Sequence, residues 1–131
     1  DLVFDAFTTD DGENFSGNRI PGATRHQYFA QLRYSNEAGW FASVEAARVG
    51  AIDLNNANTA ATEPFTRVEL RLSRGFDVAN WKLAPFVAVS NALDEAYTAN
   101  ARINAFGSRF FETGPDRAIF VGVDAKVSKG N

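Results

Sequence analysis

Alternation of apolar and polar residues decides the fold class, and it is strictest in the stretch Thr66-Arg67-Val68-Glu69-Leu70-Arg71-Leu72-Ser73-Arg74. Within it, Val68, Leu70 and Leu72 fall on one side of an extended chain, and Arg67, Glu69, Arg71 and Ser73 fall on the other. Successive side chains of a β-strand point to opposite faces of the sheet. A period of two residues therefore predicts a strand with one apolar and one polar face.

The same alternation recurs along the chain, and amphipathic helical spacing is nearly absent, so an all-β protein is expected. The stretch Gln27–Tyr34 places Tyr28, Ala30, Leu32 and Tyr34 on one face, with Phe29 as an exception on the other. Further strands are expected at Trp40–Gly50, Trp81–Asn91 and Arg117–Lys129, with a weaker candidate at Leu2–Thr8. These make about six strands, each close to the ~9–11 residues that cross a bilayer at a tilt. Pro85 lacks the backbone donor of a ladder, so a bulge or an edge is expected there.

Short and long connections alternate along the chain. The short ones are Ser35–Gly39 and Asp77–Asn80; the long, polar ones are Thr9–Arg25, Asp53–Pro64 and Leu93–Asp116. This segregation predicts an antiparallel up-and-down β-barrel or barrel segment over residues 1–131, with short turns at one rim and long loops at the other. Trp40 and Trp81 each begin a strand after a short turn, which suits a membrane interface. The alternative is that they are simply strand-capping aromatics.

Composition sets further limits on function. The chain has 131 residues, 45% of them hydrophobic and 22% charged, which is ordinary for a folded protein. Its net charge of −3 argues against nucleic-acid binding, and the absence of cysteine excludes disulfides and thiolate metal sites. No apolar run approaches the ~20 residues of a membrane helix, so any spanning role falls to strands. The chain begins at Asp1 and has no methionine, which indicates a processed product or an excised fragment.

The direction in which the two faces point stays open at this level. The charged row comprises Arg33, Glu45, Arg67, Glu69, Arg71, Lys82, Asp124 and Lys126, and the opposite row is rich in valine and leucine. In an outer-membrane barrel the apolar row meets lipid and the polar row lines a wet lumen; in a soluble lipid-binding barrel the pattern is turned inside out. Arg74 continues the apolar row near a short turn, where its head group can reach water.

One run resembles a hallmark of TonB-dependent outer-membrane receptors. It is Phe86-Val87-Ala88-Val89-Ser90-Asn91-Ala92-Leu93-Asp94-Glu95-Ala96-Tyr97, a strand that ends in Asn-x-hydrophobic-Asp followed by a charged residue and a tyrosine. Asn91 and Asp94 are suited to bond the backbone where the ladder ends. The segment Ile103–Arg117 looks like the family's aromatic, Gly-Pro-containing approach to its final strand. Residues 17–27 look like a family loop entering a strand.

The resemblance implies a non-enzymatic fragment of a receptor for uptake of an iron-siderophore or similar nutrient. It implies the outer membrane as location, with the periplasm as the alternative, and outer-membrane lipid and a small-molecule ligand as partners. In such receptors roughly 22 strands enclose a plug domain. No plug is present here, so the chain alone is not expected to transport. The ligand candidates are loop residues, which alternatively pack the loop onto the barrel: Tyr97, Arg102, Phe106, Arg109, Phe110 and Phe111.

Two features depart from the family. The chain ends Val127-Ser128-Lys129-Gly130-Asn131, without a terminal aromatic residue. About six strands also fall short of the smallest closed barrel of about eight, so open sheet edges and self-association are expected. The missing aromatic and the chain length favour the alternative function, a small soluble β-barrel that binds a fatty acid or another apolar ligand.

No catalytic, metal or cofactor site is expected. His26 is the only histidine, which excludes a multi-histidine metal site. The loop Asp10–Asn14 carries oxygen ligands for calcium, but its spacing does not match an EF-hand and a solvated loop is preferred. Glu45, Glu69 and Asp124 share a face with arginines, so ion pairing is expected in place of acid–base chemistry.

Overall fold

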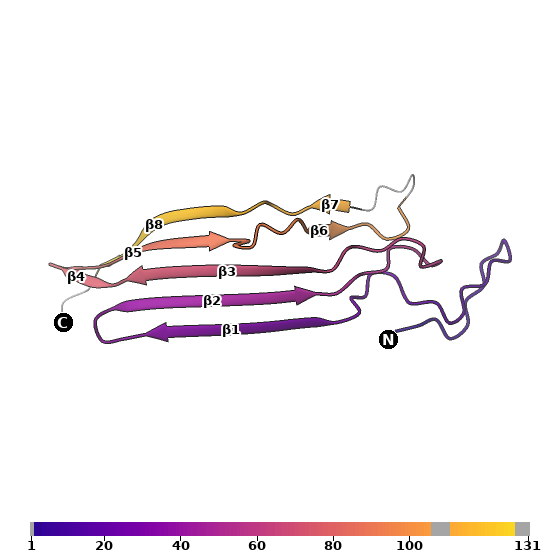
Figure 1. Ribbon diagram of the computed structural model, residues 1–131, viewed down its shortest axis with the longest axis horizontal. Helices are drawn as coiled ribbons and strands as arrows, with labels where there is room; N and C mark the ends of the chain where they lie inside the picture. The colour runs from indigo at the N-terminus through magenta and orange to yellow at the C-terminus, as the bar shows by residue number, and fades with distance from the viewer. Residues whose placement is uncertain (1, 106–110, 128–131) are drawn as a thin grey trace. The chain divides into compact units, whose positions relative to one another are not determined.

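The structure, a computed structural model, describes residues 2–105 and 111–127, without the side chain of Phe111. The described residues form strands, turns and loops, so the all-β expectation is confirmed. The five long strands begin close to the expected positions, which were Gln27, Trp40, Thr66, Trp81 and Arg117 (Figure 1). Their bounds, with those of the shorter strands, are β1 (Gln27–Ser35), β2 (Trp40–Val49), β3 (Phe65–Arg74), β4 (Phe76–Val78), β5 (Trp81–Ser90), β6 (Thr98–Ala101), β7 (Phe111–Thr113) and β8 (Ala118–Val127).

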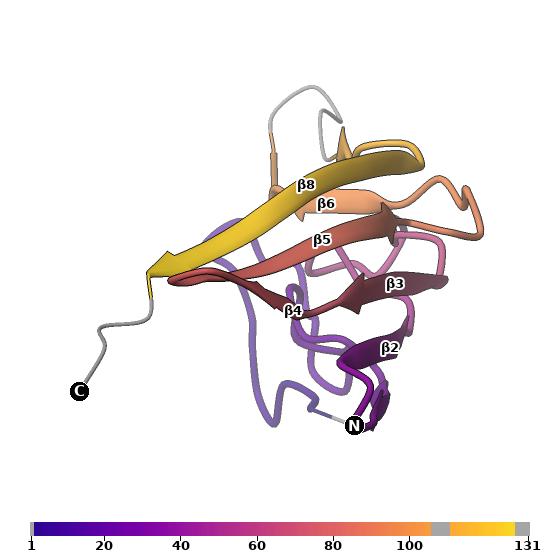
Figure 2. The same ribbon diagram turned by 90° about the vertical axis from the view of Figure 1, so that its left-hand side faces the viewer.

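Six strands form the main sheet, in the order β1-β2-β3-β5-β4, with β8 on β5. Figures 1 and 2 both show β5 between β3 and β8. The β5–β8 ladder is antiparallel and unbroken from Trp81↔Val127 to Ser90↔Ala118. Among the described residues, β1 and β8 each pair with one strand only, so the sheet is an open segment and not a closed barrel.

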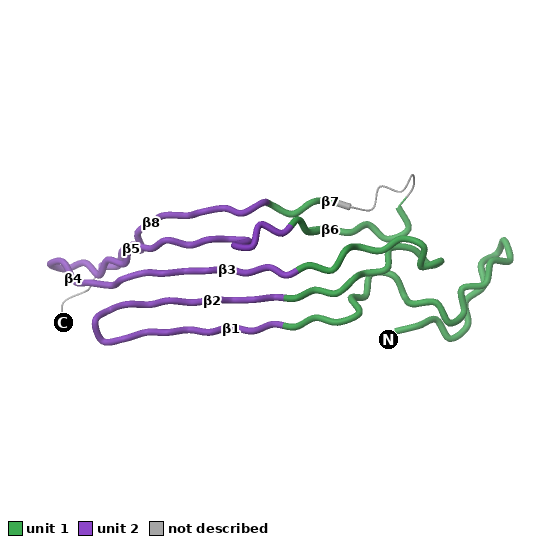
Figure 3. Tube along the Cα trace, viewed as in Figure 1, with its two compact units in different colours: residues 1–28, 48–65, 96–115 green, residues 29–47, 66–95, 116–131 purple. Residues whose placement is uncertain are grey.

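The chain divides into two compact units (Figure 3). Unit 1 comprises residues 1–28, 48–65 and 96–115, and unit 2 comprises residues 29–47, 66–95 and 116–131. Unit 2 holds β4, β5, β8 and most of β1 to β3, whereas unit 1 holds the long connections and the β6–β7 hairpin. The loop expected at Leu93–Asp116 thus contains two short paired strands.

Unit 1 is held by a small and largely polar centre. Leu54 is fully buried, and Asp53 and Thr62 are almost so. The carbonyl of Asp53 accepts a hydrogen bond from the backbone N–H of Gly22 at 2.9 Å, and that of Leu54 accepts one from Asn104 at 2.8 Å. Backbone bonds across three sequence segments therefore tie the long connections together.

The prediction of a strand at Leu2–Thr8 is wrong. Only isolated bridges form there, Val3 with Arg19 and Thr8 with Asn14. The N–H of Phe7 donates to the hydroxyl of Ser16 at 3.1 Å and not to a ladder carbonyl. A side chain thus replaces the neighbouring strand as acceptor, and a regular ladder does not propagate. The sixth strand of the main sheet is β4 in its place.

Both short connections hold turns, but the second turn is confined to Ala79 and Asn80, because Asp77 and Val78 belong to β4. In the β1–β2 turn, Asn36 accepts a hydrogen bond from the N–H of Trp40 through its side chain at 3.1 Å. The N–H of Gly75 donates to the carbonyl of Gly39 at 2.8 Å. A β-carbon on Gly39 would lie 2.3 Å from the carbonyl oxygen of Gly75, so this close approach of the two backbone segments requires glycine.

Pro85 lies at neither a bulge nor an edge. On one side of it the β5–β8 ladder runs through without a shift, with Pro85 opposite Val123. On the other side, the last β3 pair is Ser73↔Phe86 and the first β4 pair is Phe76↔Leu83. The residue without an N–H therefore faces the break between β3 and β4, where no ladder bond is needed.

Replacing Ala79 with glycine is expected to raise the free energy of unfolding by about 1 kcal/mol. Ala79, in the β4–β5 turn, has φ of 52°, where a β-carbon meets a steric cost that glycine avoids. Ala88→Gly in the interior of β5 is the matched control, with an expected loss of about 0.5–1 kcal/mol. Urea unfolding of both variants measures the difference, and a loss of stability in Ala79→Gly would contradict the argument.

Candidate functional site

The sheet of unit 2 has two chemically distinct faces, which the ladder registers define. Cross-strand partners lie on the same face, so Leu72 shares a face with Val87 and Val121, while Arg71 shares the other with Ala88 and Phe120. In β3, β4, β5 and β8 the first face, called here the apolar face, carries Leu70, Leu72, Arg74, Phe76, Val78, Trp81, Leu83, Pro85, Val87, Val89, Ile119, Val121, Val123, Ala125 and Val127. The opposite one, called here the charged face, carries Glu69, Arg71, Asp77, Lys82, Asp124 and Lys126 among smaller residues and two phenylalanines.

The apolar face is exposed. Leu70 and Val87 retain 37% and 39% of their accessible surface, and Val121 retains 82%. The only fully buried large hydrophobic residue of the described chain, Leu54, belongs to unit 1. In unit 2, therefore, the valine and leucine rows do not close over a dry core.

The charged face is cross-linked by polar contacts within unit 2. Arg71 donates to the carboxylate of Asp124 at 2.7 Å and lies 3.8 Å from the centre of the Phe86 ring. Arg67 pairs with Glu69 at 3.1 Å. Glu45 on β2 accepts a hydrogen bond from Gln31 and lies 4.0 Å from Arg33, both on β1. The expected ion pairing of the three carboxylates is confirmed. The Glu45 contact joins the neighbouring strands β1 and β2, the Glu69 pair lies within β3, and the Asp124 pair reaches from β8 past β5 to β3.

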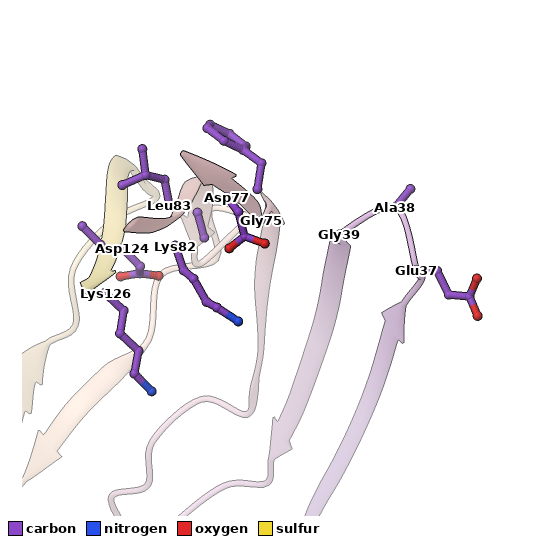
Figure 4. A pocket seen from close by; sticks show the side chains of 12 residues that line it. Glu37, Ala38, Gly39, Gly75, Asp77, Lys82, Leu83, Asp124 and Lys126 are labelled. Atoms are coloured by element: carbon purple, nitrogen blue, oxygen red, sulfur yellow. The ribbon is translucent and has the colours of Figure 1, made fainter. Parts of the chain in front are cut away.

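A cavity of about 550 Å³ lies beside the short turns (Figure 4). Lys82 and Lys126, which are direct cross-strand partners, extend side by side into this region, and Glu37 points away from them. Neither lysine forms an ion pair with a described residue. Lys82 also lies opposite Asp77 on β4, and Asp124 lines the same cavity. Charges of both signs therefore meet in this part of the charged face, which favours an aqueous environment.

Trp40 and Trp81 both lie at the short-turn end of the sheet, where β2 and β5 begin. They retain 39% and 48% of their accessible surface. Trp81 belongs to the apolar face by its register with Val127. Trp40 lies under the guanidinium of Arg74, whose carbon is 5.3 Å from the ring centre. The two tryptophans thus occupy equivalent places on one surface.

In the motif that carries the family resemblance, the side chains of Asn91, Asp94 and Glu95 form hydrogen bonds with backbone groups. This arrangement is called here the backbone staple. Asn91 is 1% exposed and has a left-handed backbone, with φ of 48°. Its side chain donates to the carbonyl of Glu95 at 3.0 Å and accepts from the N–H of Glu95 at 3.2 Å. The expectation that Asn91 and Asp94 bond the backbone where the ladder ends is therefore confirmed.

Asp94 and Glu95 extend this staple to both neighbouring strands. The carboxylate of Asp94 accepts the N–H of Arg117, just before β8, at 2.9 Å, and its other oxygen lies 3.5 Å from the guanidinium. The carboxylate of Glu95 accepts the N–H of Thr66 on β3 at 2.9 Å. The three motif residues thereby fix the end of β5 against β3 and β8.

The ligand candidates of the last long connection are only partly described. Tyr97 packs its ring 5.0 Å from that of Phe65 and against Gly114, where a β-carbon would clash with it. Arg102 is exposed and pairs with Glu112 at 3.0 Å. Phe111 lies on β7, with its side chain outside the described residues, as are all of Phe106, Arg109 and Phe110.

The β6–β7 hairpin should loosen in acid. A hydrogen bond from Asn100 and then the Arg102 guanidinium lower the pKa of Glu112 below its usual 4.5. A carboxyl whose folded pKa is depressed stabilises the fold above its unfolded pKa and loses that contribution as pH falls through the folded value. We expect this loss to begin below pH 4.5. NMR titration of the carboxyl measures it; Arg102→Gln should return the pKa toward normal, and an unchanged titration would contradict the assignment.

Sequence reasoning missed one buried charge, Asp53. Its carboxylate is bound by Arg25 at 3.0 Å and lies 3.7 Å from Arg19. Reciprocal bonds between the side chain of Asn58 and the backbone of Arg19 hold the second arginine. No periodicity marks a loop residue, so nothing in the local pattern distinguishes Asp53 from the exposed acids around it.

Within residues 2–105 and 111–127 no group of three or more His, Cys, Asp or Glu side chains is arranged to hold a metal ion. His26 lies against Gly50, with its ring 5.5 Å from that of Tyr28. No helix of the described part is long and apolar enough to cross a membrane. A scan of the chain against models of known protein families found none that matches.

Proposed function

We propose that this chain is a wall segment of an outer-membrane β-barrel receptor of the TonB-dependent kind, with the apolar face toward lipid and the charged face toward a wet interior. The observation that carries the proposal is the segregation of the two faces. In β3, β4, β5 and β8 the apolar face carries one charged residue, Arg74. The apolar side chains of this face, such as Leu70, Val87 and Val121, are nevertheless exposed. Soluble monomers rarely leave so large a contiguous apolar surface uncovered, whereas a bilayer requires one.

A soluble carrier of apolar ligands fits the sheet less well. Such a carrier needs the valine and leucine rows inside an enclosed cavity and the charges outside. In unit 2, Leu70, Val87 and Val121 are exposed together on one face. The salt bridges of the opposite face are of the kind that cross-links a polar lumen.

The open edges at β1 and β8 support the idea that the segment works as part of a larger wall. Each edge presents unpaired backbone groups, which cannot be left unsatisfied in hydrocarbon. Further strands or another copy of the chain must therefore pair with them. We propose no enzymatic activity and no transport by this segment alone; capture of an iron-siderophore or similar nutrient belongs to the complete receptor.

Single-cysteine scanning of β8 tests the orientation of the faces. The chain contains no cysteine, so each introduced thiol carries the only spin label. In phospholipid vesicles, labels at 119, 121, 123 and 125 should collide with lipid-soluble oxygen, and those at 120, 122, 124 and 126 with a water-soluble nickel chelate. A reversed pattern would support a soluble barrel, and equal access on both faces would contradict any membrane-wall role.

Loop participation in nutrient capture needs a separate measurement in cells that carry the complete receptor. Arg102→Gln removes an exposed cation that, among the described residues, pairs with Glu112. Reduced uptake of a ferric siderophore, relative to the same change at Arg33 on the charged face, would place this loop in the capture site. Equal uptake by both variants would count against it.

A further inference from the structure

We propose that Arg74, Trp40 and the groove beside them bind an anionic phospholipid, with the lipid phosphate at the guanidinium and an acyl chain along the groove. This inference rests on the proposed function, because it places the apolar face in a bilayer. It adds a defined lipid site to that face, at the short-turn end of the sheet.

Arg74 is the only charged side chain on the apolar face in the described part of unit 2. It forms no ion pair with any described residue, and its guanidinium lies over the ring of Trp40. A guanidinium at an apolar surface needs a counter-charge or water, since burial of an unpaired cation is costly. The ring supplies only part of that stabilisation. A lipid phosphate at the bilayer boundary would supply the rest, in the bidentate geometry that arginine favours.

The groove beside Arg74 has the shape and chemistry for the remainder of a lipid. It encloses about 360 Å³ and is lined by Trp40, Leu72, Ser73, Arg74, Phe76, Pro85, Phe86 and Val87. Its lining is almost wholly apolar, and Arg74 is its only charged residue. The long axis of the apolar face continues from Leu72 and Val87 toward the middle of the sheet. A molecule with one anionic head and an apolar tail matches this arrangement, whereas a free phosphate ion leaves the groove unfilled.

Trp81 provides an internal control for the site. It begins β5 at the same end of the same face, but its register partners there are Val78 and Val127, both uncharged. Among the described residues, the two tryptophans therefore differ in having or lacking a neighbouring cation on the apolar face, since Lys82 and Lys126 lie on the other face. A lipid preference that arises from Arg74 should be seen at Trp40 and not at Trp81.

Quenching of tryptophan fluorescence by brominated lipids tests the proposal. The chain is reconstituted in vesicles of equal parts phosphatidylglycerol and phosphatidylcholine, with bromine on the acyl chains of one lipid or the other. Trp81→Phe leaves Trp40 as the reporter, and Trp40→Phe leaves Trp81. We expect its apparent affinity for brominated phosphatidylglycerol to exceed that for phosphatidylcholine by about fivefold, the effect of one cation near an anionic lipid surface. Arg74→Gln should abolish the preference and Arg74→Lys should retain most of it.

The outcomes separate the site from the membrane role. If neither lipid quenches Trp40 or Trp81, the proposed function fails and this inference with it. If both lipids quench Trp40 equally, or the preference survives in Arg74→Gln, the lipid site alone is refuted. Trp40 shielded from both lipids while Trp81 is quenched would mean that another copy of the chain covers the groove. Loss of the preference on adding inorganic phosphate would show a phosphate site without lipid selectivity.

Discussion

Val121→Arg is expected to lower the free energy of unfolding in a phospholipid bilayer by about 2–4 kcal/mol, the cost of an arginine on the lipid face near the bilayer midplane. Val121 lies near the middle of β8 on the apolar face, opposite Val87. With 82% of its surface exposed, it makes few contacts that the substitution would disturb. The expected penalty therefore comes from the surrounding lipid and not from packing within the protein.

Val121→Arg also distinguishes between lipid and water as the environment of the apolar face. At an exposed site in water, a surface substitution of this kind shifts stability by no more than about 0.5 kcal/mol. Phe120→Arg, one residue earlier and on the charged face, is the matched control and should cost little in a bilayer. Reversible unfolding of both variants in vesicles gives the two values. A larger penalty for Phe120→Arg than for Val121→Arg would reverse the assignment of the faces.

Asn91→Ala should destabilise the protein by about 3 kcal/mol. Two hydrogen bonds between its buried side chain and the backbone of Glu95 are lost, which leaves backbone groups unsatisfied at about 1 kcal/mol each. Alanine must also adopt the left-handed backbone at φ of 48° without the local bonds that make asparagine tolerant of it. That conformation adds about 1 kcal/mol or more.

Asn91→Gly separates these two contributions. Glycine accepts the positive φ freely but makes neither side-chain bond, so it should lose less stability than alanine does. Urea unfolding of both variants under the same lipid conditions gives the comparison. A loss below about 1 kcal/mol for Asn91→Ala would show that the staple contributes little to holding β5 against β3 and β8.

The strands were predictable because their signal is local. Side chains alternate between faces along any extended segment, so the rows containing Leu70 and Arg71 could be assigned to opposite faces before any pairing was known. The same local geometry fails at Leu2–Thr8, where the hydroxyl of Ser16 takes the place of a ladder carbonyl. A hydrogen bond to a side chain leaves no trace in the apolar–polar pattern.

Of the candidate site, the backbone staple at Asn91 and Asp94 was predictable, because these residue types bond nearby backbone groups in characteristic turns. The distant backbone N–H groups that donate to Asp94 and Glu95 were not predictable. The carboxylate of Asp94 accepts from the N–H of Arg117, just before β8, and that of Glu95 accepts from the N–H of Thr66 on β3. Trp40 and Arg74 were each noted separately, and only the pairing of β2 with β3 brings them together.

The sequence by itself determined that this protein is made of antiparallel strands with one apolar and one charged row, since a two-residue period is a property of each strand alone. Only the tertiary structure decided that the sheet stays open, that the ladder breaks opposite Pro85, and that Arg71 meets Asp124. Those features depend on register between strands that lie far apart in the chain. Register is set by the sum of many cross-strand contacts, which no single stretch of residues contains.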